Sequence, residues 1–303
     1  MEIEEGTVKT NRHTSAYLAC GPSSGPRVYL IHGWPELSLS WRHQLYALGN
    51  VGFRAIAPDM RGYGKSSVYH SHGDYAQTEI VKDMLELHEA TGNGKAVWVG
   101  HDWGSPVVWN MALHHPEVVH GVASLCVPMG FEEGVEALIP HVNRDIYPEA
   151  EYPKGQWDYQ YFYQESFEVA QSEMEVDPYR LVKALFRKGS PEGAGKPAGT
   201  AVTRKNGGWF GQDGPPDLPI DLDVVSAEDA KTFAAALSRN GFFGANSWYM
   251  NHDKNYEYSQ ELSGDKKLDM PVLFFHGEYD LSLIHISEPT RPLYISYAVF
   301  CLK

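Results

Sequence analysis

The sequence has little of what marks several protein classes. Its 303 residues contain 3 cysteines, and no two of them form a Cys-x-x-Cys pair. A disulfide framework or a cysteine metal site is therefore not indicated. No apolar run approaches the roughly 20 residues that a membrane-spanning helix needs. The acidic N-terminus, MEIEEGTVKT, has no apolar core and predicts no secretory signal. These absences favour a reducing, cytoplasmic setting.

Positive charge is also scarce. The chain has 25 Lys and Arg against 39 Asp and Glu, a net charge of −14, with a pI near 5.4. An acidic surface repels phosphate backbones and anionic lipid headgroups, so nucleic acids and membrane surfaces are disfavoured as partners. Hydrophobic residues make up 43% of the chain, which is enough to bury a full core.

Short apolar segments alternate with helical patterns over the first 129 residues. The predicted strands span residues 27–31, 53–57, 96–99 and 118–127, and the predicted helices span 41–48, 80–90 and 107–114. This alternation is typical of a mostly parallel sheet with helices on its faces. In such a sheet, chemistry is expected beyond the carboxyl ends of the strands.

A second region, residues 130–251, has helical patterns, many aromatic residues and no clear strand. Ser226, followed by Asp229, predicts a capped helix start, and Gly241 predicts its end. A strand pattern returns at 271–275. A helical insertion between strands of one sheet predicts a lid, which divides the chain into a core at 1–129 and 252–280 and a lid at 130–251.

The segment Gly100-His-Asp-Trp-Gly104 follows a predicted strand and precedes a predicted helix. That is the context of a nucleophile elbow, a turn so tight that its flanking positions must be small. Its central residue, Asp102, is a carboxylate at a helix N-terminus, where the helix dipole favours an anion. A carboxylate is a poor acyl acceptor but a competent nucleophile towards an sp³ carbon. The residue type therefore favours alkyl transfer over ester or peptide hydrolysis.

A Gly-Trp-Pro turn follows an earlier predicted strand. The backbone N–H groups of Trp34 and Trp103 are therefore expected to converge on one oxygen as an oxyanion hole. On its own this turn is a weak signal, since Gly and Pro mark turns everywhere.

Several longer motifs share one resemblance. The chain resembles the soluble epoxide hydrolases in HGWPE (32–36), SWR (40–42), DMRGYGKSS (59–67), GHDWGSPVVW (100–109) and HHPEVV (114–119). The resemblance implies an α/β-hydrolase fold and a two-step reaction without a cofactor, in which Asp102 opens an epoxide and water then releases a diol. It implies a small apolar epoxide and water as the partners of the enzyme.

The resemblance also assigns residues outside the elbow. Tyr159 and Tyr249 match the two lid tyrosines that donate to the epoxide oxygen, and a phenol of pKa about 10 suits that task near pH 7. Gln160, Trp34 and Trp103 are expected to line the substrate site. Asp280 matches the acid that orients a catalytic histidine. His101, inside the elbow, receives no role.

Two alternatives remain open. Haloalkane dehalogenases share GHDWG, but their usual strand-end motif has Asn in place of Trp34, and halide departure needs no tyrosine pair. A non-catalytic ligand receptor on the same fold is favoured only by the absence of a Gly-His-Trp-like motif after Asp280.

The segment from Leu281 to the end of the chain looks foreign to the protein. Back-translated, Leu281–Arg291 resembles a transposase-type sequencing adapter, and Ile295–Leu302 resembles the flow-cell end of the same adapter. Such segments are excluded from fold reasoning. The sequence therefore predicts that the final strand, the final helix and the catalytic histidine of the fold are missing, and that residues 281–303 form a non-native tail. His285 receives no catalytic role.

Overall fold

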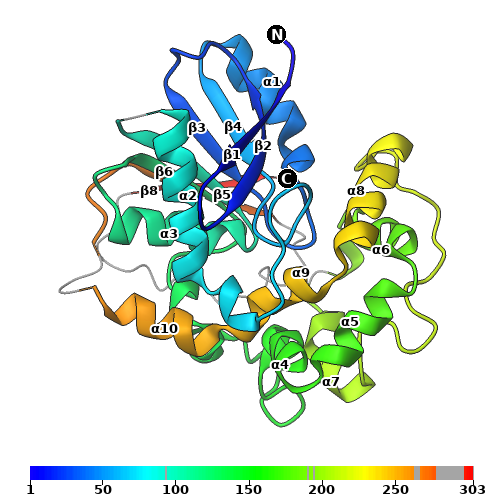
Figure 1. Ribbon diagram of the computed structural model, residues 1–303. Coiled ribbons are helices and arrows are strands. Elements are labelled where there is room, and N and C mark those ends of the chain that lie inside the picture. Colours follow the sequence, from blue (N-terminus) through cyan, green and yellow to red (C-terminus); the bar gives the residue numbers. More distant parts are fainter. Residues whose placement is uncertain (93, 190, 194, 263–266, 278–296, 303) are drawn as a thin grey trace.

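The computed structural model describes residues 1–92, 94–189, 191–193, 195–262, 267–277 and 297–302. Its centre is an eight-stranded sheet in the order β1-β2-β4-β3-β5-β6-β7-β8 (Figure 1). The strands are β1 (Glu4–Lys9), β2 (Thr14–Cys20), β3 (Arg27–Ile31), β4 (Arg54–Pro58), β5 (Ala96–His101), β6 (Val119–Leu125), β7 (Val272–Gly277) and β8 (Tyr297–Leu302).

The strands from β3 onward are parallel, and only β1 and β2 run antiparallel to their neighbours. The predicted α/β-hydrolase architecture with a mostly parallel sheet is confirmed. The sequence did not predict β1 and β2, because β1 is a largely exposed edge strand that shows no apolar alternation.

The far edge of the sheet differs from the prediction. The final strand was expected to be missing, yet β8 pairs in parallel with β7, from Val272 opposite Tyr297 to Gly277 opposite Leu302. That prediction was wrong for two physical reasons: the run YAVFCL consists largely of β-forming residues, and β7 would otherwise expose unpaired backbone groups. Residues 278–296, which include Asp280 and His285, lie outside the described residues.

Alternation along the strands places helices on both faces of the sheet. In β3, Val28 and Leu30 join the apolar cluster beneath α1, whereas Tyr29 and Ile31 join the cluster on the opposite face. The helices that follow the strands are α1 (Arg42–Asn50), α2 (Gln77–Thr91) and α3 (Gly104–His114). The 3₁₀ helix η1 (Ser38–Trp41) lies between β3 and α1, and η2 (His72–Tyr75) lies between β4 and α2.

Between β6 and β7 the described chain is helical. In Figure 1 the helices α4 to α9 lie together below and to the right of the sheet. The elements are η3 (Phe131–Glu133), η4 (Val135–His141), η5 (Gly155–Trp157), α4 (Asp158–Glu165), α5 (Phe167–Glu175), α6 (Pro178–Leu185), η6 (Pro191–Gly193), η7 (Gly199–Val202), α7 (Thr203–Asn206), α8 (Ala227–Asn240), α9 (Phe243–Ser247), η8 (Trp248–Met250) and α10 (His252–Gln260).

The predicted start and end of one of these helices are confirmed. The Ser226 hydroxyl accepts the Asp229 N–H at 3.0 Å and caps α8. The helix ends at Gly241, whose φ of 67° is one that glycine adopts without steric cost.

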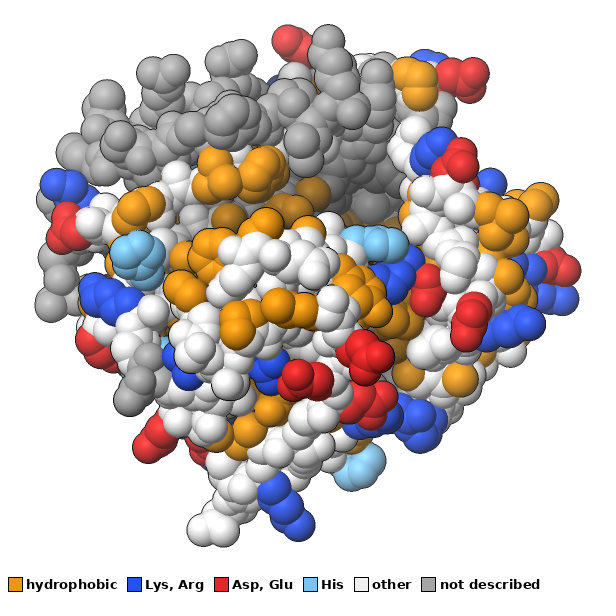
Figure 2. All heavy atoms as spheres, turned by 90° about the horizontal axis from the view of Figure 1, so that it is seen from above, with side chains coloured by type: hydrophobic (Ala, Val, Ile, Leu, Met, Phe, Trp, Pro, Cys, Tyr) orange, Lys and Arg blue, Asp and Glu red, His pale blue; other side chains and the backbone are white. Residues whose placement is uncertain are grey.

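The helices and the surface can be compared with those of proteins that bind membranes or nucleic acids. Within the described residues, none of the helices has both the length and the apolar character to cross a lipid bilayer. On the face shown in Figure 2, Lys and Arg lie among Asp and Glu, and the described side chains form no continuous basic patch there.

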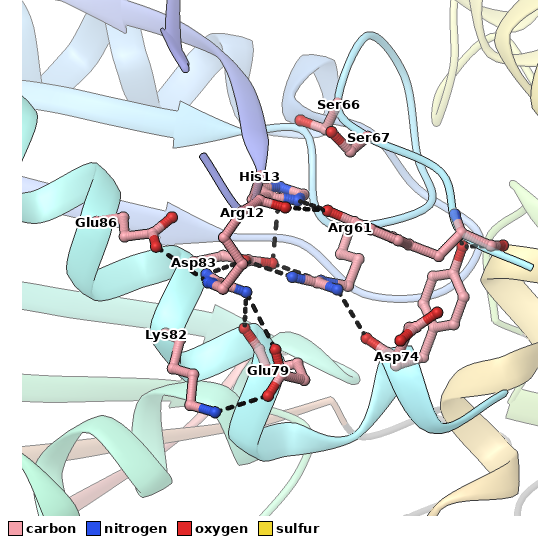
Figure 3. Close-up of polar contacts among 12 residues, drawn as sticks. Arg12, His13, Arg61, Ser66, Ser67, Asp74, Glu79, Lys82, Asp83 and Glu86 are labelled. Carbon is pink, nitrogen blue, oxygen red and sulfur yellow. Dashed lines mark hydrogen bonds and ion pairs between the residues drawn. The ribbon is translucent and has the colours of Figure 1, made fainter. Parts of the chain in front are cut away.

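A buried charge network fastens the β1–β2 hairpin to α2 (Figure 3). Asp83, only 1% exposed, accepts two hydrogen bonds from Arg61, both at 2.7 Å. Arg12, on the hairpin, binds Asp83 as well and reaches Glu79 and Glu86. Because Arg61 is itself only 3% exposed, Asp83 is the counter-ion that makes its burial tolerable.

We predict that Asp83→Asn lowers the free energy of unfolding by about 3–5 kcal/mol, because it leaves the buried Arg61 charge without its carboxylate. Urea denaturation measures the loss. The matched control is Lys65→Ala, which removes an ion pair to Glu5 whose side chains are 65% and 69% exposed. That change should cost less than about 1 kcal/mol. Equal losses in the two variants would contradict the account of the network.

Candidate active site

Asp102 lies in the tight turn between β5 and α3, with a left-handed φ of 50°. The flanking positions admit only glycine: a Cβ on Gly100 would lie 2.3 Å from the carbonyl oxygen of Gly104, and a Cβ on Gly104 would lie 2.3 Å from that of Ile31. The strand–turn–helix context that the sequence predicted for this motif is therefore present. The turn holds the carboxylate at the carboxyl edge of the sheet.

The loop after β3 closes over Asp102. Ile31 pairs with Gly100 across the sheet, so the two loops leave it side by side. The Trp34 N–H donates to Asp102 Oδ1 at 2.7 Å, and the backbone N–H of Trp103 donates to the same carboxylate. Gly33 permits this approach, since a Cβ there would lie 2.4 Å from Asp102 Oδ1. The two N–H groups that the sequence paired thus converge on one side chain.

The electrostatic environment of Asp102 combines opposing effects. Burial raises the pKa of its carboxyl group to about 6, against lowering contributions from the charge of His101 and from the Trp34 and Trp103 N–H groups. A carboxylate with this pKa is ionised at neutral pH. It is also more basic than an ordinary aspartate, which favours nucleophilic attack.

An ion pair that the sequence did not predict lies behind the nucleophile. His101 Nδ1 lies 3.0 Å from Glu36 Oε2, and Glu36 also accepts the Gly33 N–H at 3.1 Å. Burial disfavours both charges, but Glu36 raises the pKa of His101 well above its usual value, and His101 lowers that of Glu36 to about 2. His101 is therefore an imidazolium next to Asp102, a neighbouring charge that the sequence did not indicate.

Tyr159 and Tyr249 lie together near the elbow. Tyr159 comes from α4 and Tyr249 from η8, and their ring centroids are 5.9 Å apart. The Tyr249 ring lies 5.1 Å from that of Trp103. Burial raises the pKa of Tyr249 well above 10, with further raising contributions from Tyr159, Tyr163 and Asp102. Tyr249 is therefore a protonated phenol, able to donate, throughout the neutral range.

The remaining predicted residues take distinct places. Gln160 is fully buried, and its amide donates to the Tyr159 hydroxyl at 3.1 Å. The Trp34 indole donates to Asn246 of α9 at 3.0 Å, which ties the site to the helical region. Tyr161 donates instead to Glu136 at 2.7 Å. Asp280 lies outside the described residues.

Among the described residues, no three His, Cys, Asp or Glu side chains gather in the manner of metal ligands. The polar groups around Asp102 are already engaged with one another: Glu36 with His101, and the Trp34 N–H with the carboxylate.

Known proteins are similar to this chain in sequence and in fold. The family model described as the alpha/beta hydrolase fold matches residues 26–287. Epoxide hydrolase A of Mycobacterium tuberculosis is 33% identical over 280 residues, which cover 91% of this chain and 82% of that protein. This chain belongs to the epoxide hydrolases of the α/β-hydrolase fold.

Other proteins similar to this chain are also epoxide hydrolases. The bifunctional epoxide hydrolase 2 of Sus scrofa is 37% identical over 86% of this chain, and the chain spans 44% of the length of that relative. The crystal structure of epoxide hydrolase A from Mycobacterium thermoresistibile superposes with a TM-score of 0.78 at 32% identity, covering 99% of this chain and 91% of the other. An epoxide hydrolase from Vigna radiata superposes with a TM-score of 0.75 at 28% identity, covering 99% of this chain and 91% of the other.

We predict that the Asp102 carboxyl group titrates near pH 6, and that His101→Gln moves its pKa upward by removing a neighbouring positive charge. Infrared difference spectroscopy of the carboxyl band between pH 4 and 8 measures the shift. Asp102→Asn identifies the band by removing it. A downward shift in His101→Gln would contradict the assignment of an imidazolium.

Proposed function

We propose that this protein converts epoxides into vicinal diols through an ester formed on Asp102. The observation that carries the proposal is a carboxylate in the elbow with two phenols close to it. The Tyr249 ring lies 5.1 Å from that of Trp103, which follows Asp102 in the turn, and 5.9 Å from that of Tyr159. A nucleophile for carbon and a donor for the departing oxygen are the two groups that epoxide opening requires.

In the first step an Asp102 carboxylate oxygen attacks an epoxide carbon. The C–O bond of the ring breaks, and its electron pair moves to the oxygen, which becomes an alkoxide. Tyr159 and Tyr249 donate to that oxygen and supply its proton, so the product is a hydroxyalkyl ester of Asp102. The charge of the carboxylate is lost on alkylation, while the Glu36–His101 pair remains intact beneath it.

In the second step water attacks the carbonyl carbon of the ester. The N–H groups of Trp34 and Trp103, which donate to the resting carboxylate, form the oxyanion hole for the tetrahedral intermediate. The resemblance to the soluble enzymes assigns the activation of water to a histidine oriented by Asp280. The diol leaves with the hydroxyl from water, and the Asp102 carboxylate is restored. The proton that this hydrolysis releases returns to the tyrosinate left by the first step, and no cofactor takes part.

The surroundings of the carboxylate support a small apolar epoxide as the substrate. Aromatic rings from several elements meet there: Trp103 and Trp34 each pack against Tyr249, and Trp209 packs against Tyr159. Such a wall favours apolar groups and leaves the polar contacts to the epoxide oxygen.

We also assign residues 130–251 to a lid and residues 1–129 and 252–280 to the core that it covers. The composition of the chain favours a cytoplasmic setting.

The tyrosine pair separates this function from dehalogenation. A halide is a stable anion that departs without a proton donor, whereas an alkoxide is strongly basic and needs one. Two phenols packed together beside the nucleophile therefore favour an epoxide as the electrophile.

A substrate panel tests the proposal. The 303-residue chain is mixed with an apolar epoxide, a haloalkane or a p-nitrophenyl ester, and loss of each compound is followed by chromatography. We expect at least one equivalent of epoxide to be consumed per chain, and the other two to persist. Asp102→Ala should abolish consumption, and the matched control Asp213→Ala, at an exposed aspartate, should not. Loss of the haloalkane alone, or of no compound, would overturn the proposal.

The lid tyrosines give a second prediction. Tyr159→Phe and Tyr249→Phe should each slow ester formation by about 1–3 kcal/mol of lost transition-state stabilisation, and the double variant should be slower still. Rapid-quench kinetics measure the rate. Tyr161→Phe is the matched control, because its hydroxyl binds Glu136, and its rate should match the parent. If Tyr161→Phe slows ester formation while Tyr159→Phe and Tyr249→Phe do not, the assignment of the two donor tyrosines is wrong.

A further inference from the structure

One buried carboxylate holds a loop of the helical region, residues 207–211. Glu173, near the end of α5, is only 3% exposed. Its Oε1 accepts the Trp209 N–H at 2.9 Å, and its Oε2 accepts the N–H groups of Phe210 and Gly211 at 2.9 and 3.0 Å. Three consecutive backbone donors therefore converge on a single side chain, an arrangement that stabilises a buried anion.

The backbone before Trp209 makes this contact possible. Two glycines, Gly207 (φ 73°) and Gly208, connect the four-residue helix α7 to Trp209. A Cβ on Gly208 would lie 2.6 Å from Glu173 Oε2, so a larger residue would displace the carboxylate. Because paired glycines leave a loop with much conformational freedom, the three hydrogen bonds to Glu173 are needed to fix the backbone of Trp209 against α5.

Trp209 in turn packs against a tyrosine of the site. Its ring lies 5.4 Å from that of Tyr159, at an interplanar angle of 64°. It also lies 6.5 Å from the Trp34 ring, at an interplanar angle of 23°. Tyr159 is bounded in addition by Tyr249, whose ring lies 5.9 Å away. The Tyr159 ring is therefore enclosed between Trp209 of the 207–211 loop and Tyr249 of η8.

The orientation of a proton donor determines how well it reaches the oxygen that departs in the transition state. A misplacement of about 1 Å can slow a reaction by about a hundredfold. Within its own helix, the Tyr159 hydroxyl is contacted by the Gln160 amide at 3.1 Å. Trp209 comes from a separate segment and limits the rotation of the Tyr159 ring from outside the helix. Release of Trp209 would therefore leave the donor less time in its reactive orientation.

We propose that Glu173 is a positioning residue for epoxide opening, acting through Trp209 on Tyr159. This role rests on the proposed function, because it concerns the step in which Tyr159 donates to the epoxide oxygen. Glu173 itself contacts no reacting atom. Its carboxylate fixes the 207–211 loop, the loop fixes the Trp209 ring, and that ring keeps the phenol of Tyr159 directed at the epoxide.

Hydrogen exchange of the full chain, followed by mass spectrometry of its peptides, tests the contact between Glu173 and the loop. The amides of residues 209–211 should be protected in the parent. They should exchange at least about tenfold faster in Glu173→Gln, which replaces an accepting oxygen with a second donor. Gly208→Ala displaces the carboxylate from the other side and should have the same effect. Glu168→Gln, at an exposed glutamate of the same helix, is the matched control and should leave the exchange unchanged.

A double-mutant cycle tests the action through Trp209. In rapid-quench kinetics with a small apolar epoxide, Glu173→Gln and Trp209→Ala should each slow ester formation by about tenfold. The double variant should be no slower than Trp209→Ala alone, within about twofold, because both changes remove the same contact with Tyr159. A merely structural role of Glu173 would instead add its own effect to that of Trp209→Ala.

Three results would contradict the positioning role. These are free exchange of residues 209–211 in the parent, release of these residues in Glu173→Gln without slower ester formation, and additive effects of the two substitutions. Epoxide consumption by the parent separates this failure from that of the proposed function. A parent that consumes no epoxide contradicts both, whereas an active parent whose rate Glu173→Gln leaves unchanged contradicts the positioning role alone.

Discussion

The left-handed backbone of Asp102 is the constraint on which the rest of the site depends. A positive φ is costly for a residue with a side chain, and it persists only where the surroundings enforce it. Here Gly100 and Gly104 leave no room for a Cβ, and Gly33 brings the next loop against the carboxylate. The same turn places the side chain at the start of α3 and beside the Trp34 N–H. A nucleophile held on several sides loses little entropy on reaching its reactive position.

Charge alternates around this turn. Glu36 is negative, His101 positive and Asp102 negative, so the imidazolium offsets repulsion between two carboxylates at one edge of the sheet. Burial alone would push Asp102 towards its neutral form, and its neighbours limit the rise of its pKa to about 6. The group is then about nine-tenths ionised at pH 7, since one pKa unit is a factor of ten. The ion pair thus keeps a desolvated carboxylate available as a nucleophile.

Signals carried by neighbouring residues predicted individual strands and helix ends. The strand Arg27–Ile31 was predicted with the bounds the structure has, and the capped start of α8 at Ser226 follows from a hydroxyl and an N–H three residues apart. The β1 strand was missed, because its exposed edge has no apolar period. The last strand of the sheet was predicted to be missing, yet β8 pairs with β7. The prediction was based on the apparent origin of the segment, which does not determine whether its residues can form a strand.

The candidate site also contains a part that the sequence predicts and a part that it does not. The elbow residues are consecutive in the sequence, so their motif could be recognised directly. The Glu36–His101 pair joins residues that lie 65 apart in the sequence, one in the loop after β3 and the other at the end of β5. Such a contact becomes visible only when β3 and β5 are aligned. A histidine beside the nucleophile and a glutamate three residues after Gly33 were the available signals. Neither indicates that the two side chains meet.

The central claim is that the Asp102 carboxylate itself attacks the epoxide carbon. The most direct measurement mixes the chain with one equivalent of a small apolar epoxide at pH 7, quenches the reaction within the first turnover and maps the digested peptides by mass spectrometry. The account predicts a mass increase equal to that of the whole epoxide on the peptide that contains Asp102. Diol formation without an adduct on Asp102, or with the ester on another carboxylate, would contradict the account.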